Sequence, residues 1–178
     1  IKPISFNLRD YEHVIFIAPV WAAKIAMPLK SFLMDQKDGI KNYSLVVEEK
    51  ALLQNGELQS VVFLKGVDEN YRYVSGVANS MIRGNYNIGT ADSASLILGA
   101  GIENAIGVQS DRNIMPLVIY LPKKNVSELT DPMRSISTNP VVSSGAFVIQ
   151  QEFDNKYAIT NLGFMIRMLG LEANQYGG

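Results

Sequence analysis

The sequence contains no cysteine and a single histidine, His13, among its 178 residues. The lack of cysteine excludes disulfides, thiol catalysis and thiolate metal sites, and one histidine leaves almost no way to build a zinc site. A cysteine-free composition fits an extracytoplasmic domain, although many cytosolic proteins share it. Only Glu12 is acidic and close to His13, so we interpret His13 as a strand-edge residue and predict no metal ligand.

The sequence also lacks an excess of positive or negative charge. Lys and Arg number 16 against 17 Asp and Glu, which gives a net charge of −1 at pH 7. No basic stripe is present, which argues against a nucleic-acid partner. No apolar run reaches the roughly 20 residues that span a bilayer. Because the chain begins at Ile1 without a signal segment, we expect a domain excised from a longer protein, and one cut from a membrane protein would look the same.

A predicted β-hairpin over residues 46–66 organises the centre of the chain. Two apolar-rich segments flank Asn55-Gly56, a dipeptide that favours a type I′ turn because both central positions need positive φ. This turn places Leu53 opposite Leu58. The second strand leads to Asp68, which we predict to be the N-cap of a helix.

Apolar spacing predicts the other elements of an α+β fold, in which a mixed sheet built around this hairpin is packed with helices. Spacings of three and four predict one helix from 71 to 82 that ends at Gly84, and a final helix capped by Asn161. Apolar runs predict strands over 13–20, 94–98, 115–121, 141–153 and 157–159.

Two further segments have distinct expectations. The run 13–20 is continuous in apolar residues, which is typical of a strand buried on both faces of a parallel sheet, and a helix is predicted from Pro28 to Gly39. Residues 123–140 are polar and contain two X-Pro pairs. We therefore predict a long, mobile surface excursion that contacts a partner.

The segment Gly99-Ala100-Gly101 lies between a predicted strand and a predicted helix, where a phosphate-binding loop would be found. The dinucleotide fingerprint needs another glycine three residues after Gly101, but that residue is Asn104, and no Lys-Ser or Lys-Thr follows. We interpret the segment as a tight strand-to-helix turn and predict no cofactor.

An acidic set is the other candidate for chemistry, comprising Glu48, Glu49, Glu57, Asp68 and Glu69. Hairpin charges usually face water, and no pattern places two of these carboxylates in one cleft, so a general acid/base pair is not expected. Serines are plentiful, but there is no GxSxG elbow for a hydrolase. We predict that the protein has no catalytic residues and is not an enzyme.

Four blocks of sequence resemble, in order and spacing, the extracytoplasmic core domain of MacB/FtsX-type ABC transporter permeases. The resemblance covers about residues 40–178. The blocks are VVEEKALLQNGELQSVVFLKGVDENY (46–71), LILGAGIENAIGV (96–108), LVIYLPKK (117–124) and SSGAFVIQQEFDNKYAITNL (143–162).

The resemblance implies a MacB-like periplasmic domain, inserted after the first transmembrane helix of a permease for lipoprotein release or efflux. Such a domain has no catalytic activity, lies on the periplasmic side of the inner membrane, and relays motion driven by a cytoplasmic ATPase subunit or domain. The partners it implies are the parent transmembrane helices, a periplasmic protein or lipoprotein substrate, and a second permease copy.

Residues 1–44 resemble a different family. The segment DYEHVIFIAPVWAAKIAMPLKSFL (10–33) is similar to the strand, loop and helix of flavodoxins, in which an aromatic residue stacks on the flavin. Trp21 occupies that position and would be cofactor-binding if this alternative holds. The Ser/Thr-Gly-rich phosphate loop is missing, so we expect no tight FMN binding.

The two resemblances meet near residues 39–45 and leave two interpretations open. In one, residues 1–44 are a flavodoxin-like βα segment foreign to a MacB-like domain at 45–178; in the other, the chain is one integrated domain. Three functions follow: a permease domain, an FMN electron carrier, or a generic protein-interaction domain. The first is our prediction.

Overall fold

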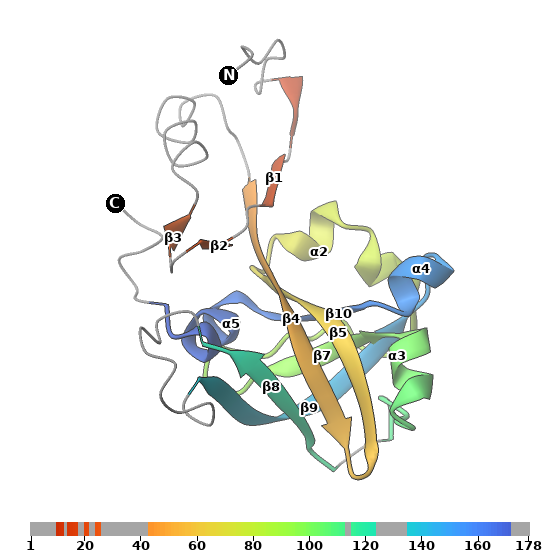
Figure 1. Ribbon diagram of the computed structural model, residues 1–178. Coiled ribbons are helices and arrows are strands. Elements are labelled where there is room, and N and C mark those ends of the chain that lie inside the picture. The colour runs from red at the N-terminus through yellow and green to blue at the C-terminus, as the bar shows by residue number, and fades with distance from the viewer. Residues whose placement is uncertain are drawn as a thin grey trace.

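A closed β-barrel of six strands forms the centre of the protein (Figure 1). The computed structural model describes residues 10–12, 14–17, 20–21, 24–25, 43–112, 115–123 and 135–171. The barrel strands are β4 (Tyr43–Asn55), β5 (Leu58–Val67), β7 (Ser95–Gly99), β8 (Leu117–Pro122), β9 (Ile136–Phe147) and β10 (Tyr157–Asn161). The other elements are β1 (Val14–Ile17), β2 (Val20–Trp21), β3 (Lys24–Ile25), β6 (Met81–Gly84), α2 (Tyr71–Val74), the 3-10 helix η3 (Val77–Ser80), α3 (Ala100–Ala105), α4 (Gln151–Asp154) and α5 (Leu162–Leu169).

The barrel closes through long-range strand pairs. Going round it, β4, β5, β10, β7, β9 and β8 follow one another, and β8 returns to β4 through Leu52, which lies opposite Tyr120. The β5–β10 and β7–β9 pairs are parallel and the other four are antiparallel. Closure pairs both edges of the strands that make up the wall.

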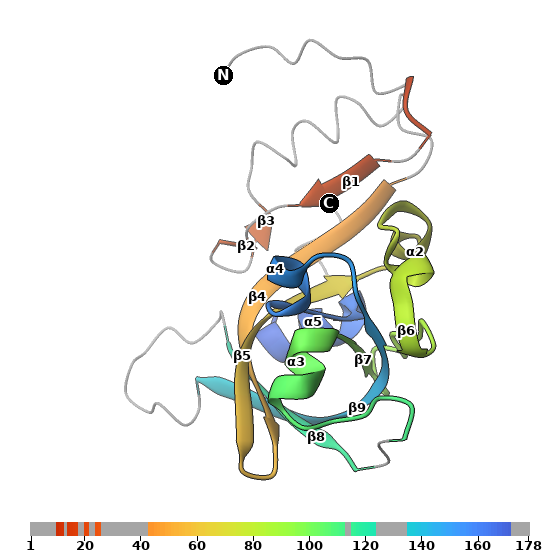
Figure 2. The same cartoon turned by 90° about the vertical axis from the view of Figure 1, so that its right-hand side faces the viewer.

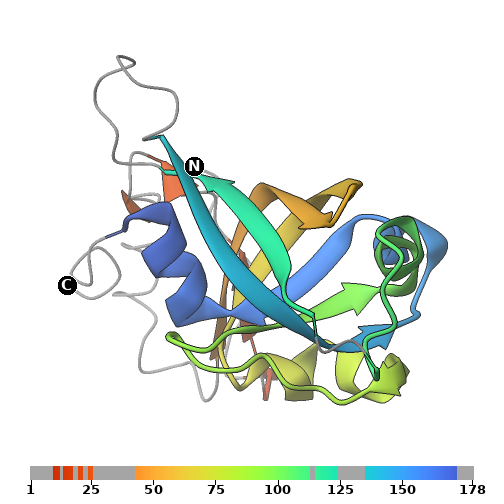
Figure 3. The same cartoon turned by 90° about the horizontal axis from the view of Figure 1, so that it is seen from below.

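Two helices close the two ends of the barrel. Figure 2 looks onto the end covered by α3, and Figure 3 shows α5 at the opposite end. Inward-facing residues of the strands pack with both helices in one core, which includes Leu53, Val62, Leu64, Leu96, Leu98, Ile102, Ile119, Leu121, Phe164 and Met165. The interior is therefore filled by side chains, as expected for a small barrel.

A second, smaller core lies outside the barrel wall. Val46, Val67 and Ile159 face outward from their strands and pack with Tyr71 of α2 and Val77 of η3. This core holds α2 and η3 against the wall.

The predicted hairpin is confirmed, but its register is wrong by two residues. Leu53 lies opposite Ser60, because the two-residue turn is Gly56-Glu57 and Asn55 still pairs with Leu58. Gly56 has a φ of +56°, the conformation that the turn needs and that glycine adopts freely. A shift of two residues leaves each side chain on its expected face.

The expected α+β, MacB-like architecture is wrong, because the sheet closes on itself and the chain is mostly β. The single helix predicted over 71–82 is also absent. Gly76, with a φ of +70°, separates one turn of α2 from η3, and the chain then extends into β6. The apolar residues spaced three and four positions apart thus lie in three short elements, α2, η3 and β6. Gly84 ends β6 rather than a helix.

The N-terminal strand was expected in the middle of a parallel sheet. The described part, β1, does pair in parallel with β4 over Val14–Ile17, but it lies at the end of the strand order, and Ile15 is 36% exposed. It is therefore an edge strand. The flavodoxin-like fold expected for residues 1–44 is wrong, because the described structure is a closed β-barrel. The predicted helix over 28–39 lies outside the described residues.

The C-terminal predictions are confirmed in part, because the strand predicted over 141–153 ends at Phe147 and residues 151–154 form α4. Asn161 caps α5, since its Oδ1 accepts hydrogen bonds from Gly163 N at 2.9 Å and Phe164 N at 3.3 Å. The ladder between β7 and β9 shifts register before Gly145, which indicates a bulge at that point. The excursion predicted over 123–140 is shorter than expected because β9 begins at Ile136; residues 124–134 lie outside the described residues. No helix among the described residues is long and apolar enough to cross a membrane.

Candidate functional site

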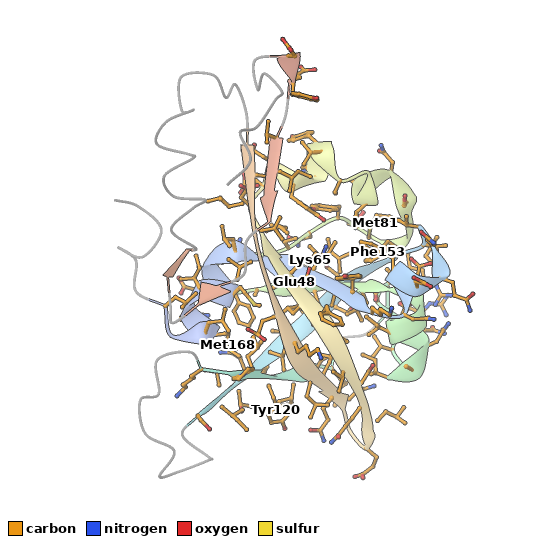
Figure 4. All side chains as sticks on the ribbon, turned by 45° about the horizontal axis from the view of Figure 1, so that its top comes forward. Glu48, Lys65, Met81, Tyr120, Phe153 and Met168 are labelled. Carbon is orange, nitrogen blue, oxygen red and sulfur yellow. The ribbon has the colours of Figure 1, made fainter. Side chains whose placement is uncertain are left out.

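A buried lysine marks the outer face of the β4–β5 ribbon. Strand alternation directs Leu64 into the barrel and Lys65 outward, where it lies opposite Glu48 in register. Lys65 Nζ is 3.5 Å from Glu48 Oε2 (Figure 4). Lys65 is only 6% exposed. Because water hardly reaches its ammonium group, neighbouring protein groups must stabilise the positive charge.

Two aromatic rings complete the surroundings of Lys65. Its Nζ lies 4.3 Å from the Tyr157 ring centroid and 5.2 Å from that of Phe153. The two rings are themselves stacked, with centroids 4.3 Å apart. The negative faces of the rings favour the ammonium group. Lys65 is thus held by one carboxylate and two rings.

Asp68 connects this ribbon to α2. Its carboxylate accepts hydrogen bonds from Ser44 Oγ at 2.7 Å, Leu45 N at 2.9 Å and Tyr71 N at 3.2 Å. The predicted N-cap position was wrong, because Asn70 precedes the helix and makes no side-chain cap bond. Asp68 nevertheless accepts from the first helical N–H, so it satisfies the donor that a cap would satisfy.

Three tyrosines in this region keep their protons to higher pH. Burial raises the pKa of Tyr71, Tyr86 and Tyr157 above 10.0; the Glu48 carboxylate adds to the shift of Tyr71 and Tyr157. For Tyr86, Tyr71 also contributes, while the Arg72 guanidinium acts in the opposite direction. At neutral pH these phenols are therefore protonated and cannot act as bases. The buried Tyr86 hydroxyl has no hydrogen-bond partner among the described residues.

A cleft of about 410 Å³ lies between α2 and residues 86–89. Its lining includes Arg72, Tyr73, Tyr86 and Ile88. The Arg72 guanidinium carbon is 5.4 Å from the Tyr73 ring centroid and 5.7 Å from that of Tyr86. The volume is in the range of small-ligand sites.

An apolar groove of about 360 Å³ lies on the barrel wall. Val61 and Tyr120 are the cross-strand neighbours of Leu52, and Pro122 and Ile136 complete the groove. Val61 is 65% exposed and Ile136 is 46% exposed. Apolar residues that form a groove together distinguish this surface from single exposed side chains.

The acidic residues singled out in the sequence have different surroundings in the fold. Glu48 pairs with Lys65, Glu49 accepts from Lys50 N at 3.2 Å, and Asp68 is engaged by three donors. Glu57 is exposed at the hairpin turn and Glu69 lines the cleft. No cluster of three or more potential metal ligands occurs among the described residues.

The glycines of Gly99-Ala100-Gly101 serve close packing, which confirms the tight-turn interpretation. A Cβ on Gly99 would overlap the backbone carbonyl oxygen of Asp154, and one on Gly101 would overlap Asn155 Oδ1. The turn after α4 therefore covers the start of α3, where a phosphate would have to bind.

Sequence reasoning did not identify Lys65, Arg72 or Tyr86. A lysine within the apolar run VVFLKGV is a signal for a buried cation, since lysine is rarely fully buried unless paired. Arg72 and Tyr86 meet only in the fold and have no such signal. His13 and the side chain of Trp21 lie outside the described parts of the chain.

Comparison of the chain with protein-family models gives no match, and neither does comparison with curated protein sequences.

Proposed function

We propose that the chain is a non-catalytic, partner-binding domain on the extracytoplasmic side of an ABC-type permease. The sequence blocks described above support the permease context. The observation that supports a non-catalytic role most directly is that the charged side chains buried in the described structure are engaged by protein groups.

Three of these buried charges illustrate the point. Lys65 pairs with Glu48. The Glu103 carboxylate accepts from Ser110 N at 2.7 Å and Arg83 Nη1 at 3.3 Å. Asp154 accepts from Ile149 N at 2.9 Å. A general acid or base must be able to reach a substrate, whereas these groups hold strands and loops together.

The form of the barrel supports a mechanical role. Its interior is filled and both ends are closed by helices, so a force on one strand is transmitted through continuous packing. The groove around Leu52 and Val61 and the cleft beside Arg72 leave the outer surface available for contacts. A rigid body with contact surfaces suits a domain that passes nucleotide-driven motion to a partner.

The test begins with the gene that encodes the chain. Its full product, carrying an affinity tag, is expected to contain transmembrane segments on both sides of this region, to fractionate with membranes and to co-purify with an ATP-binding subunit or domain. A full product without transmembrane segments would refute the permease assignment, and so would one whose purified complex lacks ATPase activity.

A further inference from the structure

Arg72 differs from the other described arginines in its partners. Arg83 pairs with Glu103 at 3.3 Å, Arg112 with Asp111 at 3.9 Å, and Arg167 with Asp92 at 2.6 Å. Among the described residues, Arg72 contacts two tyrosine rings and forms no ion pair. Its guanidinium therefore has no carboxylate within ion-pair distance among the described residues, although it lines a cleft.

The rings orient the guanidinium without using its hydrogen-bond donors. Tyr73 and Tyr86 each lie within 6 Å of the Arg72 guanidinium carbon, the range of cation–π contacts. No hydrogen bond from Arg72 to a described residue accompanies these contacts, so its planar N–H donors can match the two oxygens of a carboxylate.

The opposite wall of the cleft is fixed by hydrogen bonds. Asn87 Oδ1 accepts from Gly89 N at 2.9 Å, Asn161 Nδ2 donates to Gly89 O at 3.1 Å, and Ser144 Oγ donates to Asn87 O at 2.5 Å. Ile88, between them, is only 6% exposed. A wall held at several points needs little ordering when a ligand binds.

The charges around the cleft limit which anion fits. Glu69 lines the cleft, and the Asp68 carboxylate lies close enough to affect the pKa of Tyr86. Both carboxylates repel any anion, and the repulsion grows with the charge of the ligand, so a monocarboxylate is repelled less than a dianionic phosphate. The Tyr73 ring, which is 72% exposed, and the Tyr86 ring favour a flat or apolar body attached to that carboxylate.

We propose that the cleft between α2 and residues 86–89 binds a monocarboxylate with an adjoining flat or apolar group, through the Arg72 guanidinium. The carboxylate belongs either to a small organic acid or to a glutamate in an extended peptide of a partner. This site is independent of the proposed permease role, because it follows from the geometry of the cleft alone.

The test is a titration followed by two-dimensional ¹H–¹⁵N NMR on the whole chain. Benzoate represents the small acid, with benzamide as its uncharged match; an end-blocked Gly-Glu-Gly peptide represents the partner, with Gly-Gln-Gly as its match. Saturable shifts are expected at Arg72 Nε–H and at the amides of Asn87 and Gly89, with a dissociation constant of about 1 mM or below. The uncharged matches are expected to bind at least about tenfold more weakly.

Variants assign the effect to one side chain. Arg72→Gln is expected to abolish the shifts, and Arg72→Lys to weaken binding because it keeps the charge and loses the planar donors. Arg112→Gln is the control, since the Arg112 side chain is 79% exposed and lies outside the cleft. Tighter binding of benzoate identifies a small acid, and tighter binding of the peptide identifies a partner protein. No saturable shift with either probe, or shifts unchanged in Arg72→Gln, would overturn the proposal.

Discussion

Substitution of Glu48 is expected to lower the free energy of unfolding more than substitution of Lys65, because the two side chains are unequally buried. The Lys65 side chain is 7% exposed and that of Glu48 is 28% exposed. Glu48→Gln leaves a buried ammonium group without its carboxylate. Breaking a fully buried pair costs about 3–5 kcal/mol; the partial exposure of Glu48 and the two rings around Lys65 reduce our expectation to about 2 kcal/mol.

Lys65→Met is the contrasting substitution. Methionine fills a similar volume, and the carboxylate left behind can be hydrated from its exposed side. The loss of two cation–π contacts, about 0.5–1 kcal/mol each, is offset by the desolvation that lysine no longer requires. We therefore expect the free energy of unfolding to stay within about 1 kcal/mol of the original, both in Lys65→Met and in the double variant.

Urea unfolding followed by circular dichroism measures all four proteins, and the double-mutant cycle gives the coupling energy. Glu57→Gln, at the exposed hairpin turn, is the control for loss of a carboxylate and is expected to change stability by less than about 0.5 kcal/mol. The reasoning is refuted if Lys65→Met is the more destabilising of the two single variants, or if Glu48→Gln behaves like Glu57→Gln.

Three further predictions concern the tyrosines and the turn at α3. The folded-state pKa values of Tyr71, Tyr86 and Tyr157 lie above 10.0, so the unfolded chain loses these protons first as the pH rises. The free energy of unfolding therefore keeps its full value below pH 10 and falls above it. A spectrophotometric titration in which all eight tyrosines ionise together would contradict this. Tyr86→Phe removes a buried hydroxyl that has no described partner and is expected to raise the free energy of unfolding by about 1 kcal/mol, whereas a clear loss would show that the hydroxyl is bonded. Gly99→Ala should cost at least about 2 kcal/mol, because the methyl group meets the Asp154 backbone, and an unchanged melting temperature would disprove this close contact.

Local features of the sequence were sufficient for elements whose cause is local. Short apolar runs identified strands 94–98 and 157–159, and Asn161 was recognisable as a cap because its amide oxygen accepts from N–H groups only two and three residues later. The turn at Gly56 was located, although the register was off by two residues because the turn is Gly56-Glu57 and Asn55 still pairs with Leu58. The Asn55 side chain also makes a contact that the sequence does not reveal, since its Nδ2 donates to Ile106 O at 2.9 Å.

The candidate site likewise depends partly on local sequence and partly on contacts that only the fold creates. The sequence places Lys65 on the outward face of β5, because Val62 and Leu64 face inward, but α4 and β10 supply Phe153 and Tyr157, which surround it. The acidic residues could be named from the sequence, yet only the fold separates those engaged by protein donors from Glu69, which lines the cleft.

Sequence patterns alone were sufficient to identify the hairpin over 46–66, the chain reversal at Gly56 and the Asn161 cap of the last helix. The tertiary structure decided that the sheet closes, because closure depends on Leu52 pairing with Tyr120 across more than sixty residues of sequence. The alternation of apolar and polar residues specifies which face of a strand is buried, but it does not specify the neighbouring strand. Strands with similar patterns could pair at the same sheet edge, and tertiary packing selects one arrangement. The cleft beside Arg72 has the same origin, since α2 and residues 86–89 become neighbours only after the barrel wall has brought them together.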